Sequence, residues 1–234
     1  SIATLDSDYD GYTDRLYASD VGGNVWRFDL PGSNPFGSEP WSVFKLASIA
    51  STGSNKRKFF YQPEVARTYF SKVTEYAVNG KLVNVTRKEV PFEAIVVGSG
   101  DRTNPLGKDV SDHLYMIRDE NVLTESFKTG APTTIQFSEL MPMTADTFGS
   151  LLSDYNGFVE QEYRLASFKG WYYQLGATEK ALASPSVIGG VAYFPTFTPG
   201  VSTSNCSLTG GLGALYAFNL HYGVKVYNNL KFDA

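Results

Sequence analysis

One short strand pattern recurs three times along the chain and limits what the chain can fold into. Each copy opens with Leu-Tyr, continues with apolar residues and ends in a polar turn; the copies cover residues 16–20, 114–119 and 215–219. Short strands bounded by turn residues are typical of antiparallel all-β architectures. The Tyr residues of successive copies, Tyr17, Tyr115 and Tyr216, are roughly 100 residues apart. Ordinary propeller repeats have about 40 to 50 residues, so equivalent strands at this spacing require insertions between them.

Further strand candidates surround each copy. They cover residues 24–28, 94–97, 170–175, 185–188 and 191–194, and a Gly189-Gly190 hairpin turn separates the last two. Aromatic residues make up 15% of the chain and charged residues 19%, a balance that fits many short strands. We therefore predict an all-β chain in which residues 1–234 form one β-propeller segment of about three blades, fewer than a closed ring needs.

Two stretches interrupt the strand pattern. A polar loop is predicted from Pro31 to Lys58, with a turn at residues 31–35. In the second stretch, apolar residues recur at helical spacing between residues 139 and 152, with Ser138 as the N-cap. This spacing predicts a short inserted helix over residues 138–153.

Charge and cysteine content exclude several classes of protein. The net charge is −4 and the pI about 5.2, which argues against binding the phosphate backbone of a nucleic acid. No apolar run approaches the ~18 residues of a membrane span. Because residues 2–5 resemble the middle of a strand, we interpret the chain as a fragment of a larger protein. Cys206 is the single cysteine, so the chain contains no internal disulfide and no thiolate metal cluster.

The residues with the clearest chemistry lie near the N-terminus, where residues 6–14 read DSDYDGYTD. This segment matches D-x-D-x-D-G-x-x-D, the first nine positions of a calcium loop. The predicted metal ligands are the side chains of Asp6, Asp8, Asp10 and Asp14 and the carbonyl of Tyr12. Calcium takes six to eight hard oxygens of this kind.

The loop departs from an EF-hand at its twelfth position. A bidentate Glu normally stands there, whereas this chain has Tyr17 inside a predicted strand. Losing one carboxylate lowers the expected calcium affinity to roughly micromolar or weaker. The alternative is an acidic turn that binds nothing, but four aspartates within nine residues repel one another unless a cation offsets their charge.

Other motifs give weaker signals. His113 and His221 lie far apart in sequence with no other His or Cys nearby, which argues against a zinc site. Gly98-Ser99-Gly100-Asp101 lacks the Lys and the following helix of a phosphate loop, so we interpret it as a turn at the end of a strand.

Residues 6–30 resemble the calcium loop and following hairpin of the PilY/PilC family of type IV pilus biogenesis factors and tip adhesins. The resemblance continues in VVGSGDRTNPL at residues 96–106, in EKALASP at residues 179–185 and in YFPTFTP at residues 193–199. It implies a C-terminal, modified seven-bladed propeller in an exported protein at the cell surface, the pilus tip or the outer membrane and periplasm of a Gram-negative bacterium. It also implies pilus components such as minor pilins, and an attachment surface or host cell, as partners. Bound Ca²⁺ would then control pilus extension and retraction, surface attachment and twitching motility.

We thus predict a non-enzymatic, calcium-binding pilus assembly and adhesion factor. Two other classes stay open at this point. One is a calcium- and quinone-dependent propeller dehydrogenase, which would need aromatic groups such as Trp26, Trp41 and Trp171 to converge. The other is a carbohydrate-binding propeller module that uses exposed Tyr and Trp side chains.

Overall fold

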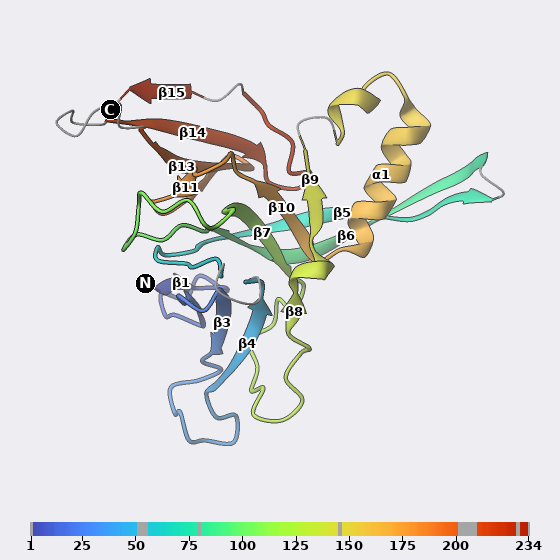
Figure 1. Ribbon diagram of the computed structural model, residues 1–234. Helices are drawn as coiled ribbons and strands as arrows, with labels where there is room; N and C mark the ends of the chain where they lie inside the picture. The colour runs from blue at the N-terminus through green and yellow to red at the C-terminus, as the bar shows by residue number, and fades with distance from the viewer. Residues whose placement is uncertain are drawn as a thin grey trace.

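The computed structural model describes residues 2–50, 56–78, 81–144, 147–200, 210–227 and 230–233. In these residues the chain is mostly β-structure, as predicted. The described strands form three sheets, here called sheets A, B and C, which follow one another from bottom to top in Figure 1. None of the three closes on itself within these ranges.

Each sheet contains a row of four strands in which neighbours pair antiparallel, and a fifth short strand. Sheet A consists of β1 (Ile2–Leu5), β2 (Arg15–Ser19), β3 (Asn24–Asp29) and β4 (Ser42–Ser48), and β8 (Ile135–Gln136) adds in parallel to β4. Sheet B consists of β5 (Glu64–Val78), β6 (Lys81–Gly98), β7 (His113–Asp119) and β10 (Gly170–Gln174), and β9 (Met141–Met143) adds in parallel to β10. Sheet C consists of β11 (Lys180–Ala181), β13 (Val191–Pro199), β14 (Gly211–Asn219) and β15 (Leu230–Asp233), and β12 (Ser186–Ile188) also pairs with β13.

Sheet B is buried on both faces. Alternate residues of a strand point to opposite faces, and on β6 Ile95 and Val97 pack toward sheet A while Ala94 and Val96 pack toward sheet C. The same alternation holds on β7, where all seven residues are buried. Two apolar cores result, one between sheets A and B and one between sheets B and C.

The three Leu-Tyr strands are β2, β7 and β14, one in each sheet. Each lies between two antiparallel neighbours, and the side chains of Tyr17, Tyr115 and Tyr216 are buried. The predicted turn at Gly189-Gly190 is confirmed, because Ile188 pairs with Val191 and both glycines have positive φ.

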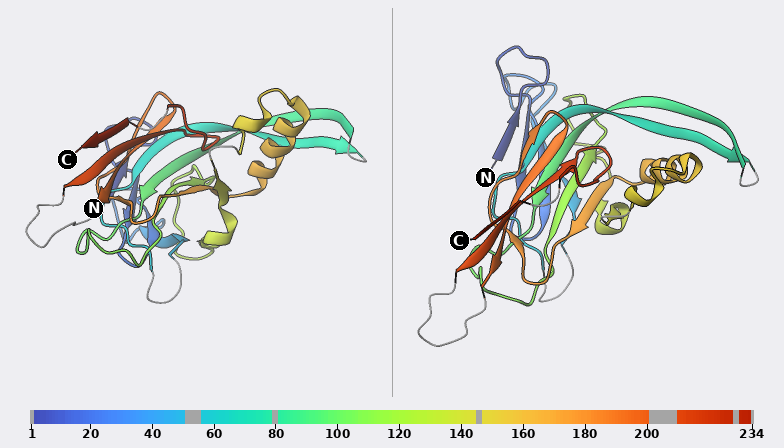
Figure 2. Two further views of the ribbon diagram at one scale, coloured as in Figure 1. Left: turned by 45° about the horizontal axis from the view of Figure 1, so that its top comes forward. Right: turned by 90° about the horizontal axis from the view of Figure 1, so that it is seen from above.

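A long β5–β6 hairpin projects beyond the rest of the strands, as Figures 1 and 2 show. Helix α1 (Tyr155–Ser167) packs beside it on β5. Arg87 of β6 binds the buried carboxylate of Glu162 on α1 at 2.5 Å. No helix among the described residues combines the length and apolar character that a membrane crossing needs.

The predicted helix at residues 138–153 is wrong. Within the described part of this range lie strand β9, the end of the 3₁₀ turn Phe137–Glu139 and the whole 3₁₀ turn Gly149–Leu151. Met141 and Met143 are buried two residues apart, which is strand periodicity. The helix begins later because the Asp154 side chain caps it by accepting from the backbone N–H of Gly157.

The predicted polar loop from Pro31 to Lys58 is also wrong in part, since it contains β4. Phe44 and Leu46 are buried and alternate with Val43 and Lys45, so one face of β4 completes the core between sheets A and B. Cys206 lies outside the described residues.

Candidate metal centre

The aspartate loop connects β1 to β2 and brings three carboxylates together. One ligand oxygen from each of Asp6, Asp8 and Asp14 lies within 4.8 Å of the other two. Two oxygens bound to one calcium ion at about 2.3 to 2.6 Å cannot be more than about 5.2 Å apart. The three carboxylates therefore fit a single calcium ion, both in chemical type and in spacing.

The other two predicted ligands are placed differently. Asp10 is not part of this group of three, and its Oδ1 accepts from the backbone N–H of Tyr12 at 2.8 Å. The Tyr12 ring is 76% exposed. Asp10 and the Tyr12 carbonyl thus stay predicted ligands.

Backbone turns hold the loop in shape. Asp6 accepts from the backbone N–H groups of Tyr9 and Gly11 at 2.7 and 2.9 Å. Gly11 has φ +91°, a conformation that favours glycine. Asp side chains that accept from the backbone two to five residues ahead fix tight turns of this kind.

The end of the loop is joined to its beginning through Ser7. Asp14 Oδ2 accepts from both the backbone N–H and the hydroxyl of Ser7, at 2.6 and 2.5 Å. The second carboxylate oxygen of Asp14 is not used in this contact. Asp14 can therefore hold the loop closed and still offer an oxygen to a metal ion.

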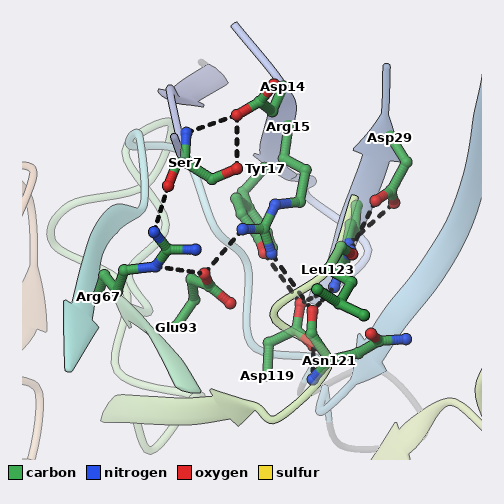
Figure 3. Close-up of polar contacts among 11 residues, drawn as sticks. Ser7, Asp14, Arg15, Tyr17, Asp29, Arg67, Glu93, Asp119, Asn121 and Leu123 are labelled. Carbon is green, nitrogen blue, oxygen red and sulfur yellow. Dashed lines mark hydrogen bonds and ion pairs between the residues drawn. The ribbon is translucent and has the colours of Figure 1, made fainter. Parts of the chain in front are cut away.

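A chain of charged contacts ties this closure to the buried part of the protein (Figure 3). The Ser7 carbonyl accepts from Arg67 of β5, and Arg67 Nε lies 3.4 Å from Glu93 Oε1 on β6. The same Glu93 oxygen lies 2.8 Å from Arg15, the residue that follows Asp14. Burial raises the pKa of Glu93, although Arg15 opposes this shift. The loop and sheet B are thus joined in one ring of contacts, which we call the Arg67 ring: Asp14, Ser7, Arg67, Glu93 and Arg15.

Next to the Arg67 ring, Arg27 organises the residues that follow β7. Its guanidinium binds Asp29 at 2.6 Å and Asp119 at 2.8 Å, and it also donates to the carbonyls of Asn121 and Leu123 (Figure 3). Tyr17 donates its hydroxyl to the same Asp119 carboxylate at 2.9 Å. Tyr17 is fully buried. The residue at the twelfth loop position therefore points into the core and not toward the aspartates of the loop.

Sequence reasoning missed Arg67, Glu93 and Arg27. Arg67 and Glu93 lie in stretches without a motif, and Arg27 lies in a predicted strand to which no such role was assigned. Their contacts join residues far apart in the chain, 60 positions for Ser7 with Arg67 and 78 for Arg15 with Glu93. A buried charge in a strand was the available signal, since Asp, Glu and Arg are almost never fully buried unless they are paired.

The two histidines lie apart. His113 packs among Tyr115, Phe137 and Tyr172 between sheets A and B, while His221 contacts Phe92 and lies 3.0 Å from the Thr68 hydroxyl.

Gly98 is the last residue of β6, and Ser99-Gly100-Asp101 follow it, as predicted for a strand end. A Cβ on Gly100 would lie 2.5 Å from the Ala181 carbonyl oxygen. A Cβ on Gly98 would lie 2.4 Å from the Ala181 Cβ, so both glycines allow a close approach of the β6 end to Ala181 of sheet C. Sequence reasoning did not predict this role.

The three tryptophans also lie in different places. Trp171 is buried in the core between sheets B and C. Trp26 on β3 donates to Asp20 and packs under Lys45, and Trp41 precedes β4 beside the aspartate loop.

The fold and the aspartate loop together define a three-sheet β protein with a candidate calcium centre between its first two strands. No family model matches the chain. A type IV pilus biogenesis factor, the PilY1 homolog of Xylella fastidiosa, is 27% identical over 95% of the chain. The crystal structure of the Pseudomonas aeruginosa PilY1 C-terminal domain matches with a TM-score of 0.55 at 15% identity, again over 95% of the chain. The predicted resemblance to the PilY/PilC family is thus confirmed.

The chain covers only part of both relatives. It spans 14% of the length of the Xylella protein and 47% of the crystallised Pseudomonas chain. The match to the Pseudomonas structure shows similarity of fold alone, because its sequence identity is low.

Proposed function

We infer that the chain is a calcium-binding part of a non-enzymatic type IV pilus assembly and adhesion factor, exported to the cell envelope or pilus tip. In this proposal, Asp6, Asp8, Asp10 and Asp14 ligate Ca²⁺ through their side chains and Tyr12 ligates it through its carbonyl. The convergence of the Asp6, Asp8 and Asp14 oxygens within 4.8 Å is the observation that carries the proposal. The relatedness to a PilY1 homolog supports the link to pili.

Bound calcium would stiffen the loop and, through the Arg67 ring, fix its position on sheet B. An ion that binds the folded chain but not the unfolded chain stabilises the fold by about 2.7 kcal/mol at a hundredfold excess over Kd. In the pilus, the calcium-loaded and calcium-free forms would then differ in how they contact minor pilins. That difference would set the balance between extension and retraction, and with it surface attachment and twitching motility.

The propeller architecture is part of the same proposal. Three features support it: a row of four strands with antiparallel neighbours in each sheet, the burial of both faces of sheet B, and the order of the sheets along the chain. In a propeller, successive blades are four-stranded sheets that pack face to face in sequence order. We propose that the three sheets are three blades of a modified seven-bladed ring.

The dehydrogenase alternative has less support. A quinone site would need cationic and aromatic groups around one cavity, and Trp171 and Trp26 are each engaged in separate packing contacts. Reduction of an artificial electron acceptor by the full-length protein with added quinone would favour this alternative.

Calcium titration by calorimetry on the full-length protein tests the proposal. We expect saturable one-site binding in the native protein and its loss in Asp8→Ala and Asp14→Ala, since each variant removes one converging carboxylate. Asp109→Ala, an exposed Asp distant in sequence from the loop, is the matched control and should bind as the native protein does. If the native protein takes up no calcium, the loop is an acidic turn and the proposal fails.

A second experiment addresses the pilus. The gene for Asp14→Ala, and separately that for Asp109→Ala, would replace the native copy, with twitching zones and surface pili as readouts. We expect altered twitching only for Asp14→Ala. Normal twitching in a strain whose protein has lost calcium binding would show that the metal site does not control the pilus.

A further inference from the structure

A cleft of about 770 Å³ opens directly beside the aspartate loop. Its walls come from the loop itself, from residues 30–33 with Trp41, from Arg67, and from residues 122–124 after β7. Ser7, Asp14, Arg67 and Leu123, which Figure 3 labels, are among the residues that line it. Clefts of about 300 to 1,000 Å³ with aromatic and a few polar groups are typical small-ligand sites.

Exposed apolar side chains gather in this cleft. Trp41 is 44% exposed, Tyr12 76% and Leu123 68%, and all three line it. The Trp41 ring is held in place, because its Nε1–H donates to the Gly32 carbonyl at 2.6 Å. With its N–H satisfied, the indole presents an apolar surface that a ligand can cover without losing a hydrogen bond.

The metal ion would reach into the same cleft, an argument that rests on the proposed function. Tyr17 at the twelfth loop position is buried and bonded to Asp119, so it supplies no oxygen to the ion. Calcium takes six to eight oxygens, and the remaining ones must come from water or from a ligand. Asp8 and Asp14, two of the converging carboxylates, line the cleft, so a ligand there can replace that water.

Charge decides which class of ligand fits best. Four loop carboxylates, one divalent ion and the Arg67 guanidinium leave one net negative charge in and around the cleft. An acidic peptide would add negative charge beside Asp8 and Asp10, whereas a neutral molecule with paired hydroxyls supplies oxygens to the ion without adding charge. Hydroxyl groups can also donate to the carboxylates, and the C–H face of a sugar ring can cover Trp41.

We propose that this cleft binds a neutral carbohydrate through vicinal hydroxyl groups on the loop-bound calcium ion, with Trp41 packing against the sugar ring. The chain would then contribute a calcium-dependent glycan contact, in addition to the regulatory role proposed above. Trp41 and Leu123 are the side chains that act on the sugar without taking part in metal binding.

Ligand-observed NMR on the full-length protein tests the proposal, with methyl α-mannopyranoside, methyl α-fucopyranoside and methyl β-galactopyranoside as probes. We expect saturation transfer from the protein to at least one of these sugars in calcium, and its loss in chelator. Trp41→Ala should weaken sugar binding by about tenfold or more, because it removes the aromatic surface. Phe36→Ala is the matched control, since Phe36 is 91% exposed on the same loop but does not line the cleft.

Calcium calorimetry on the same variants separates the two proposals. Trp41→Ala should bind calcium with the native affinity, so a sugar defect with intact calcium binding supports the cleft. Calcium binding by the native protein without any sugar signal overturns the carbohydrate proposal and leaves the metal site standing. Sugar binding that persists in chelator or in Trp41→Ala, or preferential binding of a poly-glutamate peptide, also overturns it.

Discussion

Arg67 offers the sharpest test of how the metal loop is coupled to the rest of the fold. Replacing it by Met keeps the aliphatic stem but removes the donor to the Ser7 carbonyl and the second cation near Glu93. Glu93 keeps Arg15 at 2.8 Å, so no buried charge is left unpaired. The main loss is therefore the anchoring of Ser7, which itself holds Asp14.

The expected loss of calcium affinity follows from how exposed the Arg67 side chain is. Hydrogen bonds to charged groups contribute about 1.5 to 3 kcal/mol when buried. The Arg67 side chain is 34% exposed, which reduces the expected contribution to about 1 kcal/mol. Without this anchor we expect the calcium-free loop to leave the conformation that binds the ion, so that calcium binding must supply the lost free energy. Because about 1.4 kcal/mol is tenfold in affinity, Arg67→Met should weaken calcium binding about fivefold.

The assay is calcium calorimetry with Arg87→Met as the matched control. Arg87 belongs to the same hairpin and is 36% exposed, but it pairs with Glu162 on α1 and not with the loop. We expect the calcium Kd of Arg87→Met to be that of the native protein. A Kd for Arg67→Met within twofold of the native value, or an equal shift in both variants, would refute the coupling.

Three further predictions concern stability, each measured by urea unfolding. Arg27→Met leaves two buried carboxylates without their cation and should cost about 3 to 5 kcal/mol; a loss below about 1 kcal/mol would contradict the role of Arg27. Burial lowers the pKa of His113 to about 4. Between about pH 6.5 and 4 the unfolded chain is therefore protonated at His113 while the folded chain is not, and the free energy of unfolding falls as the pH drops through this window. The loss should be about 2 kcal/mol from about pH 7.5 to 5, and His113→Gln should reduce this pH dependence. Gly100→Ala would place a Cβ 2.5 Å from the Ala181 carbonyl oxygen and should cost about 1 to 3 kcal/mol, whereas Gly32→Ala, with open space around it, should be near neutral.

Local features could be predicted from the sequence. The Leu-Tyr strands and the Gly189-Gly190 turn depend on residues within a few positions of one another, and the structure has them where they were expected. The aspartate loop is equally local, since its ligand types and spacing lie within nine residues. The convergence of Asp6, Asp8 and Asp14 follows from that spacing and from the turn at Gly11.

The helix predicted at residues 138–153 is wrong because competing local signals were close in strength. The apolar spacing at residues 139–152 fits a helix, but Met141 and Met143 are buried as a strand beside β10. Pairing with β10 selects the strand over the helix. Pairing partners that are distant in sequence cannot be recognised in a window of ten residues. The cap at Asp154 then places the helix after this strand.

The surroundings of the loop were decided by the tertiary structure. Arg67 is 60 residues from Ser7 in sequence, and Arg15 is 106 residues from Asn121, yet each pair is in hydrogen-bond contact. Trp41 and Leu123 share one cleft although no motif connects them. The sequence by itself determined which residues are the predicted cation ligands, because ligand chemistry and turn geometry depend on residues within nine positions. Only the packing of sheets A and B decided what holds that loop and what lies beside it, because contacts between distant strands depend on how the whole chain folds.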